Sequence, residues 1–300
     1  MESSDFSVFL RMCKEIQHRG VFWIQGTGGN LSVKDNDILW IKGSGKRLDS
    51  ISGLSDLAPL KYGSFVKNEI KNFDITDSGL EEALNKALQS GHSKPSMETP
   101  FHAILPFKWV CHFHSLTAIV CYQKIKKDLR NFLDWYAKNW RSSFGDFALI
   151  EKQTPGLSLS REIFNSPLAQ VYFLQNHGVI LASNSVTDFE KYQQFESELF
   201  DFLKLEKFKN INDYLKSGWS GKIYFPDLAV VQSKLKNLLS KNGNSYFLAN
   251  DADTNLKEIF ASACVLDHYH TELTPLNEEE VNKIESLPTE KHRISMLGKK

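Results

Sequence analysis

Two histidines separated by one residue, His112 and His114, stand in the apolar segment WVCHFHS at positions 109–115. In a β-strand, side chains two positions apart project from the same face, so both imidazoles would point one way and Cys111 the other, into a core. Imidazole nitrogen is a common ligand of zinc and other divalent metals. The pair therefore predicts part of a metal site, although two histidines in a sheet can also be satisfied by hydrogen bonds alone.

A third histidine, His177, belongs to a polar tetrad, QNHG, that interrupts an apolar strand-like segment at positions 175–178. Polar groups inside such a segment cost free energy unless they are paired or functional. Gly178 would let the backbone bend and re-aim His177, as a β-bulge does. The interruption therefore makes His177 a candidate for the same chemistry as the histidine pair.

A carboxylate comes shortly before the histidine strand. Glu98 and His102 are four residues apart in a segment, 98–105, whose Pro100 suits the first turn of a helix. If this segment is helical, the two side chains share a face. A carboxylate beside two histidines would make a metal-assisted acid/base site. The alternative is that Glu98 only caps the helix and His102 packs in the core.

Glycine clusters flank a predicted hairpin. QGTGGN precedes the strand-like LSVK, and the second strand, ILWIKG, runs into SGK. Glycine lets backbone N–H groups approach an anion closely, so these loops could bind phosphate. Their spacing is not that of a P-loop, and ordinary turn chemistry is the alternative explanation.

Several further segments must position these residues. Helical spacing of apolar residues predicts amphipathic helices over 5–19, 124–145 and 186–208, and a capping-box pattern, Ser78 with Glu81, predicts another from position 77. FALIEK, from position 147, predicts a strand, and TPGLSLSREI a turn that enters a helix. The mixture of cations and aromatic residues in 124–145 could stack nucleic-acid bases, but it fits a helix that covers the core.

The character of the chain changes after position 210. The remainder predicts two short strands and three helices, the last of them capped by Asn277 and Glu280. It also contains a second histidine pair, His268 and His270, at the end of a helical pattern. Residues two apart do not face each other on a helix, so we do not expect this pair to hold a metal.

Composition narrows the class of protein. The 300 residues carry 36 basic and 36 acidic side chains, so no electrostatic footprint for nucleic acid or an acidic membrane is present. The 4 cysteines are scattered, which favours a reducing compartment. The N-terminal stretch does not have the pattern of a signal peptide, and no apolar run reaches membrane-spanning length. We therefore expect a soluble cytoplasmic protein without a nucleic-acid or membrane partner.

With these motifs in place, the chain resembles the class II aldolase/adducin family, the zinc-dependent sugar-phosphate aldolases similar to fuculose- and rhamnulose-1-phosphate aldolases. The resemblance covers about residues 7–205 and is carried, in order, by GGNLS, IKGSG, PSMETPFH, VCHFHS and NHG. It implies an α/β fold, with a three-layer α/β/α catalytic domain around a mostly antiparallel sheet over 1–210 and a small C-terminal α/β extension over 211–300. It also implies a homotetramer with active sites at subunit boundaries.

The resemblance also assigns roles by position. It implies that the zinc ligands are His112, His114 and His177 and that Glu98 is the catalytic acid/base. The positions that match the substrate-phosphate site are Asn30, Ser44, Gly45 and Ser96. Met97 departs from the pattern, which has a second serine there, although the neighbouring Lys46 could compensate. The resemblance further implies that a tyrosine from a neighbouring subunit assists, and it does not indicate which one.

The activity implied is retro-aldol cleavage of a ketose phosphate or a related hydroxy-carbonyl compound, with zinc stabilising an enediolate and Glu98 moving the proton. Three neutral imidazoles would leave zinc an open position, as a catalytic site requires. A sugar-phosphate dehydratase or epimerase of the same family is an alternative, although the epimerases usually carry aspartate at the Glu98 position. A non-catalytic adducin-like scaffold is another, although a scaffold need not keep all these ligands.

Overall fold

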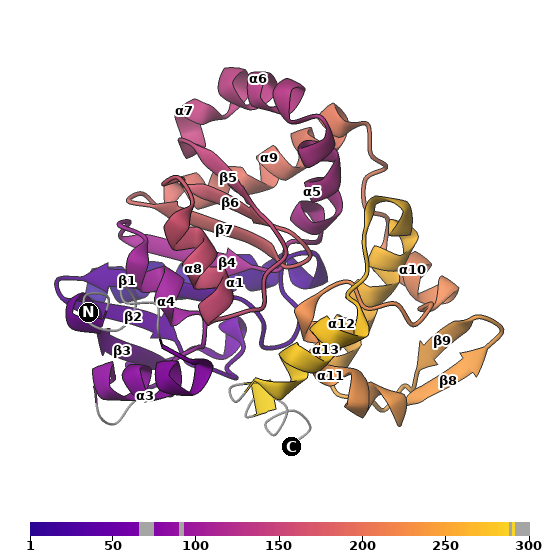
Figure 1. Ribbon diagram of the computed structural model, residues 1–300, viewed down its shortest axis with the longest axis horizontal. Coiled ribbons are helices and arrows are strands. Elements are labelled where there is room, and N and C mark those ends of the chain that lie inside the picture. Colours follow the sequence, from indigo (N-terminus) through magenta and orange to yellow (C-terminus); the bar gives the residue numbers. More distant parts are fainter. Residues whose placement is uncertain (66–74, 90–92, 288–289, 292–300) are drawn as a thin grey trace.

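A seven-stranded sheet lies at the centre of the computed structural model, which describes residues 1–65, 75–89, 93–287 and 290–291 (Figure 1). Its strands are β1 (Asn30–Asp35), β2 (Ile38–Lys42), β3 (Leu57–Lys61), β4 (Trp109–Phe113), β5 (Phe147–Ile150), β6 (Val171–Leu174) and β7 (Gly178–Ser183). Their order is β3-β2-β1-β4-β7-β6-β5, and only β5 and β6 are parallel. The expected α/β fold with a mostly antiparallel central sheet is confirmed.

Helices cover both faces of this sheet. They are α1 (Ser3–His18), α2 (Tyr62–Phe65), α3 (Asp77–Ala87), α4 (Thr99–Ile104), α5 (Leu116–Lys127), α6 (Leu129–Asn139), α7 (Arg141–Phe144), α8 (Leu157–Asn165) and α9 (Thr187–Leu203). Short 3-10 turns lie at Gly20–Phe22, Leu48–Ser50 and Leu54–Asp56. One buried cluster joins the sheet to α1, α5, α6 and α9, and two others join it to α3, α4 and α8. The molecule therefore has the three layers expected.

Alternation along β4 separates its side chains between these layers. Cys111 and Phe113 are fully buried in the core that α1, α5 and α9 cover. Val110 belongs to the opposite core, under α4 and α8, and His112 points to that same face because it is two residues further on. Cys111 is thus a core residue, as its position in the strand predicts.

A second unit follows the sheet domain. It contains α10 (Ile211–Ser217), α11 (Pro226–Lys236), α12 (Thr254–His268), α13 (Glu278–Ser286), a short 3-10 turn (His270–Glu272) and a hairpin of β8 (Leu239–Asn242) with β9 (Ser245–Leu248). Two strands were expected and are present, but the described part of this unit has four α-helices where three were expected. As expected, Asn277 and Glu280 form a capping box on α13.

The two units share a core. Leu116, Ile119 and Val120 of α5 are buried in the same apolar cluster as residues of α11 and α12. In Figure 1 the second unit, drawn in orange and yellow, lies beside the sheet domain. The division of the chain near position 210 remains a prediction, and this packing shows how closely the units are joined.

Two local expectations were wrong. Segment 124–145 is not one helix, because Asp128 leaves the helical conformation (φ −124°, ψ 49°) between α5 and α6. The cap of α3 is Thr76, whose hydroxyl accepts a hydrogen bond from the N–H of Gly79 at 3.2 Å, and not Ser78 with Glu81. Both errors concern where a helix begins or ends, which periodicity specifies poorly.

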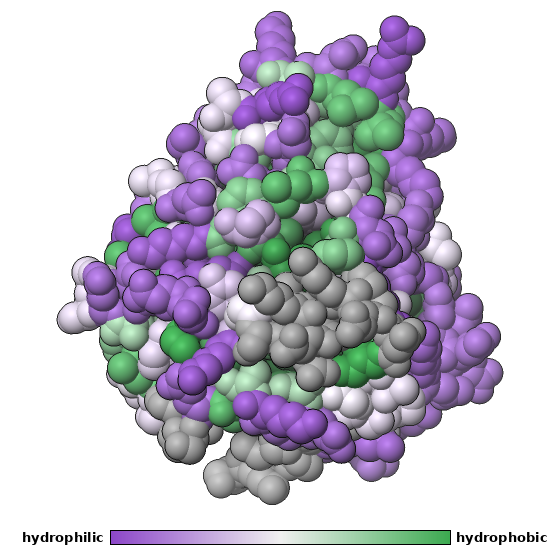
Figure 2. Space-filling model, turned by 60° about the vertical axis from the view of Figure 1, so that its left-hand side comes forward, coloured by the Kyte–Doolittle hydropathy of each residue, from purple (hydrophilic) through white to green (hydrophobic). Residues whose placement is uncertain are grey.

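The surface agrees with the balanced composition. On the face drawn in Figure 2, hydrophilic residues predominate and hydrophobic residues reach the surface in separate patches. None of the described helices combines the length and the apolar character that a membrane span requires.

Candidate metal centre

β4 fixes His112 at the floor of the site. The strand pairs with β1 on one side and β7 on the other, which places His112 opposite Asn30 and Ile180. The His112 side chain is fully buried, and its Nδ1 lies 3.0 Å from the carbonyl oxygen of Val179. That carbonyl can only accept, so Nδ1 carries the proton and Nε2 has the lone pair that a metal needs.

His177 lies beside this strand because the QNHG tetrad forms the tight turn between β6 and β7. The expectation of a bulge within one strand was therefore wrong: the two segments pair as an antiparallel hairpin. Gly178 has φ +128°, and a Cβ there would lie 2.3 Å from the carbonyl oxygen of Phe113 and 2.7 Å from the Cα of His114. Only glycine lets this turn approach the end of β4 so closely.

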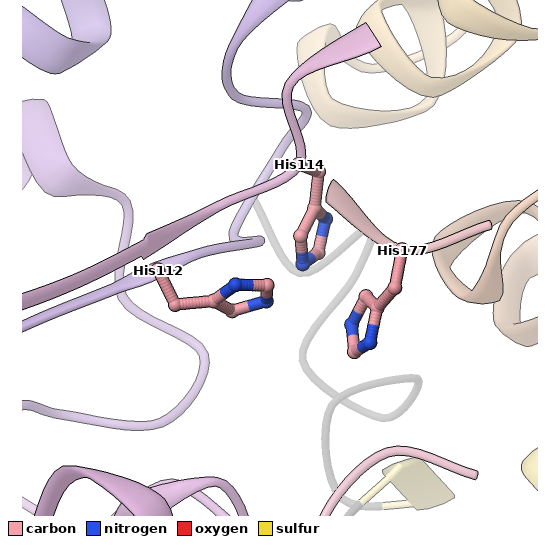
Figure 3. A group of neighbouring side chains, drawn as sticks. All are labelled: His112, His114 and His177. Carbon is pink, nitrogen blue, oxygen red and sulfur yellow. The ribbon is translucent and has the colours of Figure 1, made fainter. Parts of the chain in front are cut away.

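His114 follows the last residue of β4 and lies under the first glycine cluster. A Cβ on Gly28 would come within 2.9 Å of the His114 ring, so the loop packs directly on the imidazole. Figure 3 shows the rings of His112, His114 and His177 converging on one space. One ring nitrogen from each histidine lies within 4.8 Å of the others, and all three side chains are buried.

Glu98 stands at the edge of this group. It is the residue before α4, but its side chain does not cap that helix. Its Oε1 lies 3.6 Å from Nε2 of His112 and 3.4 Å from Nε2 of His177. Its Oε2 accepts a hydrogen bond from Nδ2 of Asn30 at 2.7 Å. The helix-cap alternative is therefore not what the structure shows, and Asn30 contacts the carboxylate directly.

Burial sets the charge state of the floor of the site. Desolvation, with the nearby His114 as the second cause, lowers the pKa of His112 to about 3. The ring is therefore neutral at physiological pH, and neutral imidazole is the form that binds a metal. The neutral His112 ring, its Nε2 without a hydrogen-bond partner and the convergence of the three imidazoles fit a divalent metal such as zinc.

The positions predicted to hold phosphate lie around one cavity. Asn30, Ser44, Gly45 and Ser96 all line it, together with Glu98, His114 and His177. Met97 also lines this cavity, at the position where the family pattern has serine. Lys46 does not take the place of that serine, since its Nζ pairs with Asp56 at 2.9 Å, away from the lining. The residues predicted to bind phosphate therefore share a cavity with the candidate metal centre, and Lys46 does not line it.

Three charged residues that line this cavity, Lys42, Asp227 and Glu290, were not predicted from the sequence. Lys42, at the end of β2, is buried, and its Nζ donates to the carbonyl oxygens of Thr27 (3.1 Å) and Lys46 (2.7 Å). Asp227, at the start of α11, is buried against His114. The burial of Lys42 had one possible signal in the sequence, its position as the last residue of the apolar strand β2. Asp227 had none, because acidic residues are common in the first turn of a helix.

The other histidines lie outside the centre. His102 is fully buried, bonds through Nδ1 to the Ser32 hydroxyl at 2.8 Å and stacks on Phe101, which is the packing alternative for this residue. His268 lies 3.3 Å from Glu206, and His270 contacts the carbonyl oxygen of Asp267 at 2.9 Å. Each ring of the second pair thus has its own separate partner.

Comparison with known proteins matches residues 8–192 to a family model described as Class II Aldolase and Adducin N-terminal domain. A curated relative, the uncharacterized oxidoreductase YuxG of Bacillus subtilis (strain 168), is 28% identical over 176 residues, which are 51% of this chain and 23% of that protein. The chain thus spans less than a quarter of the length of that relative.

One solved structure shows the same fold, and a second is a weaker match. The N-terminal class II aldolase domain of a conserved protein from Thermoplasma acidophilum matches with a TM-score of 0.55 and 23% identity, over 68% of this chain and 95% of that chain. A sugar-phosphate aldolase from Thermotoga maritima matches with a TM-score of 0.48 and 13% identity, over 67% of this chain and 96% of that chain.

Proposed function

Because the chain belongs to the class II aldolase and adducin N-terminal domain family, we propose that it is a metal-dependent lyase that cleaves a ketose phosphate or a related hydroxy-carbonyl compound by a retro-aldol reaction. The observation that carries the proposal is the convergence of three buried histidine nitrogens within 4.8 Å, with Glu98 Oε1 3.4 Å from the nearest ring. A scaffold would not need a carboxylate and three imidazoles in one cavity.

In this proposal His112, His114 and His177 hold the metal, with zinc as the expected ion. A bound divalent metal would act as a Lewis acid that polarises a substrate carbonyl and its adjacent hydroxyl. The cavity offers that substrate the side chains of Asn30, Ser44 and Ser96 and the glycine loops. Buried Lys42 lines the same cavity, and its positive charge favours an anionic group such as phosphate.

Glu98 has the role of moving the proton. In a retro-aldol cleavage the hydroxyl on the leaving fragment loses its proton, the carbon–carbon bond breaks, and the electrons stay on the carbonyl fragment, which is then protonated. The Asn30 amide holds Oε2 of Glu98 by a hydrogen bond at 2.7 Å, and Oε1 faces the histidines. This arrangement keeps one carboxylate oxygen directed at the place where the substrate would bind.

The test is Glu98→Gln, which keeps an oxygen that can accept from Asn30 but removes the base. We expect the variant to retain its metal, measured by elemental analysis, while aldehyde release falls by about 100-fold or more. The substrate panel contains ketose phosphates and the matching unphosphorylated compounds, because Met97 alters the expected phosphate site. Glu151→Gln, at an exposed carboxylate paired with Lys126, is the matched control and should behave as the unmodified protein.

Two outcomes would contradict the proposal. Full turnover by Glu98→Gln with metal bound would remove the carboxylate from the mechanism. If the substrate were consumed but no shorter aldehyde product were released, the reaction would be a dehydration or an epimerisation at the same centre.

The expected homo-oligomer is also part of this proposal, with a tetramer as the expected state. Light scattering at several protein concentrations tests it, and a monomer at all of them would contradict it. A cytoplasmic location remains a prediction from the scattered cysteines.

A further inference from the structure

Asp227 brings a carboxylate into the candidate metal centre from the second unit. It is the second residue of α11, after Pro226, and its side chain is only 1% exposed. Its Oδ2 contacts Nδ1 of His114 directly. An acidic residue in the first turn of a helix is favoured by the helix dipole, but the dipole does not explain burial against a histidine ring.

Independent contacts fix the second unit at this place. Asn176, in the turn that carries His177, donates through Nδ2 to the carbonyl oxygens of Tyr224 (2.8 Å) and Thr274 (2.7 Å). Tyr224 is three residues before Asp227, so the segment leading into α11 is held next to the histidine turn. The position of Asp227 is therefore set by the backbone around it.

The first glycine cluster is held to the same unit. Glu258 of α12 accepts a hydrogen bond from the N–H of Gly26 at 2.7 Å. The same carboxylate pairs with Arg47, with distances of 2.9 and 3.0 Å to the two terminal nitrogens of the guanidinium. The glycine loop that packs on His114 is thus hydrogen-bonded to α12 of the second unit.

The arrangement around His114 parallels that around His112. A metal-binding histidine commonly donates its second ring N–H to a carbonyl oxygen or a carboxylate, which fixes the orientation of the ring. At His112 the carbonyl oxygen of Val179 contacts Nδ1, and Nε2 remains for the metal. At His114 the carboxylate of Asp227 contacts Nδ1, which leaves Nε2 of that ring for the same purpose.

We propose that Asp227 is a positioning residue of the metal centre: it holds His114 through Nδ1, so that Nε2 faces the metal, and its negative charge strengthens that ring as a ligand. The inference rests on the proposed metal triad and adds a residue from outside the region, 8–192, that matches the family model. It makes the second unit a component of the centre.

The experiment measures metal binding by the full-length chain without using turnover. Metal-free protein is titrated with zinc in competition with a chromophoric chelator, and with cobalt for its visible absorption spectrum. We expect Asp227→Ala to weaken zinc binding by about 10- to 100-fold and to change the cobalt spectrum. Asp227→Asn keeps an oxygen that can accept from Nδ1 but loses the charge, so its loss should be smaller.

Asp267→Asn is the matched control, since this carboxylate also belongs to the second unit but bonds to Ser220, with its Oδ1 2.7 Å from the hydroxyl. It should bind zinc and cobalt as the unmodified protein does. Circular dichroism checks folding, and if Asp227→Ala does not fold, the isosteric Asp227→Asn decides. Unchanged zinc affinity and cobalt spectrum in the folded Asp227 variants would overturn this inference alone. Absence of zinc binding by the unmodified protein would overturn the proposed function, and this inference with it.

Discussion

Glu196 shows what burial does to a single carboxyl group beneath the site. It accepts hydrogen bonds from Nε1 of Trp23 at 2.5 Å and from the hydroxyl of Ser115, the residue after His114. Burial nevertheless raises the pKa of Glu196 from 4.5 to about 7. Between pH 4.5 and about pH 7, the carboxyl group of Glu196 therefore keeps its proton in the folded protein and loses it in the unfolded chain. The free energy of unfolding therefore falls as pH rises through this interval.

Glu196→Gln removes this dependence, because an amide does not titrate. Between pH 5 and pH 8 we expect the unmodified protein to lose about 2 kcal/mol more stability than the variant. Urea unfolding of both proteins at the two pH values measures the difference, with the exposed Glu151→Gln as control. If Glu196→Gln and the unmodified protein lost the same stability between pH 5 and pH 8, the Glu196 carboxyl group would have an ordinary pKa in the folded protein.

The turn between β6 and β7 determines whether the histidines can meet. A side chain at Gly178 would collide with the end of β4, at Phe113 and His114. We expect Gly178→Ala to destabilise the protein by about 2 kcal/mol more than Gly243→Ala, because both carry backbone strain but only Gly178 also clashes. Gly243 also has a positive φ, of +60°, and nothing lies within 4 Å of the position of its Cβ.

Thermal unfolding measures this difference, and zinc titration tests its consequence. Because the clash falls on the Cα of His114, the Gly178→Ala variant should also bind zinc more weakly, whereas Gly243→Ala should not. Equal stability and equal zinc affinity of the two alanine variants would show that β4 and the turn can separate without cost.

Individual elements were predictable where the signal is local. The two-residue alternation in WVCHFHS places His112 and identifies Cys111 as core, and the polar interruption identifies His177. The convergence of the rings depends on β4 pairing with β7, a neighbour from far along the chain, and periodicity says nothing about which strands pair. The role of Asp227 could not be predicted for the same reason, because its partner, His114, lies far away in the sequence and in the other unit.

At the scale of the whole molecule, the second unit covers apolar surface of the first. Leu116, Ile119 and Val120 share a buried cluster with residues of the second unit, and Asn176 bonds to its backbone. A chain cut after residue 210 would expose this surface and lose Asp227. We expect such a fragment to bind a hydrophobic dye strongly, to unfold at lower temperature than the full chain and to bind zinc more weakly.

Calorimetry, dye fluorescence and zinc titration compare the fragment with the full chain. Together they test this expectation and the predicted boundary near position 210. A fragment that unfolded at the same temperature and bound zinc with the same affinity would mean that the first unit is an autonomous domain.

The middle position of β4, with three strands on each side of it, has a further consequence for how the metal would be captured. The backbone that carries His112 is held from both sides before any ligand arrives, so binding would order little of the chain. The change in heat capacity on zinc binding should then be small, and the amide protons of β4 should be among the slowest to exchange with solvent even in the metal-free protein. The centre would be a rigid receptor formed by folding itself.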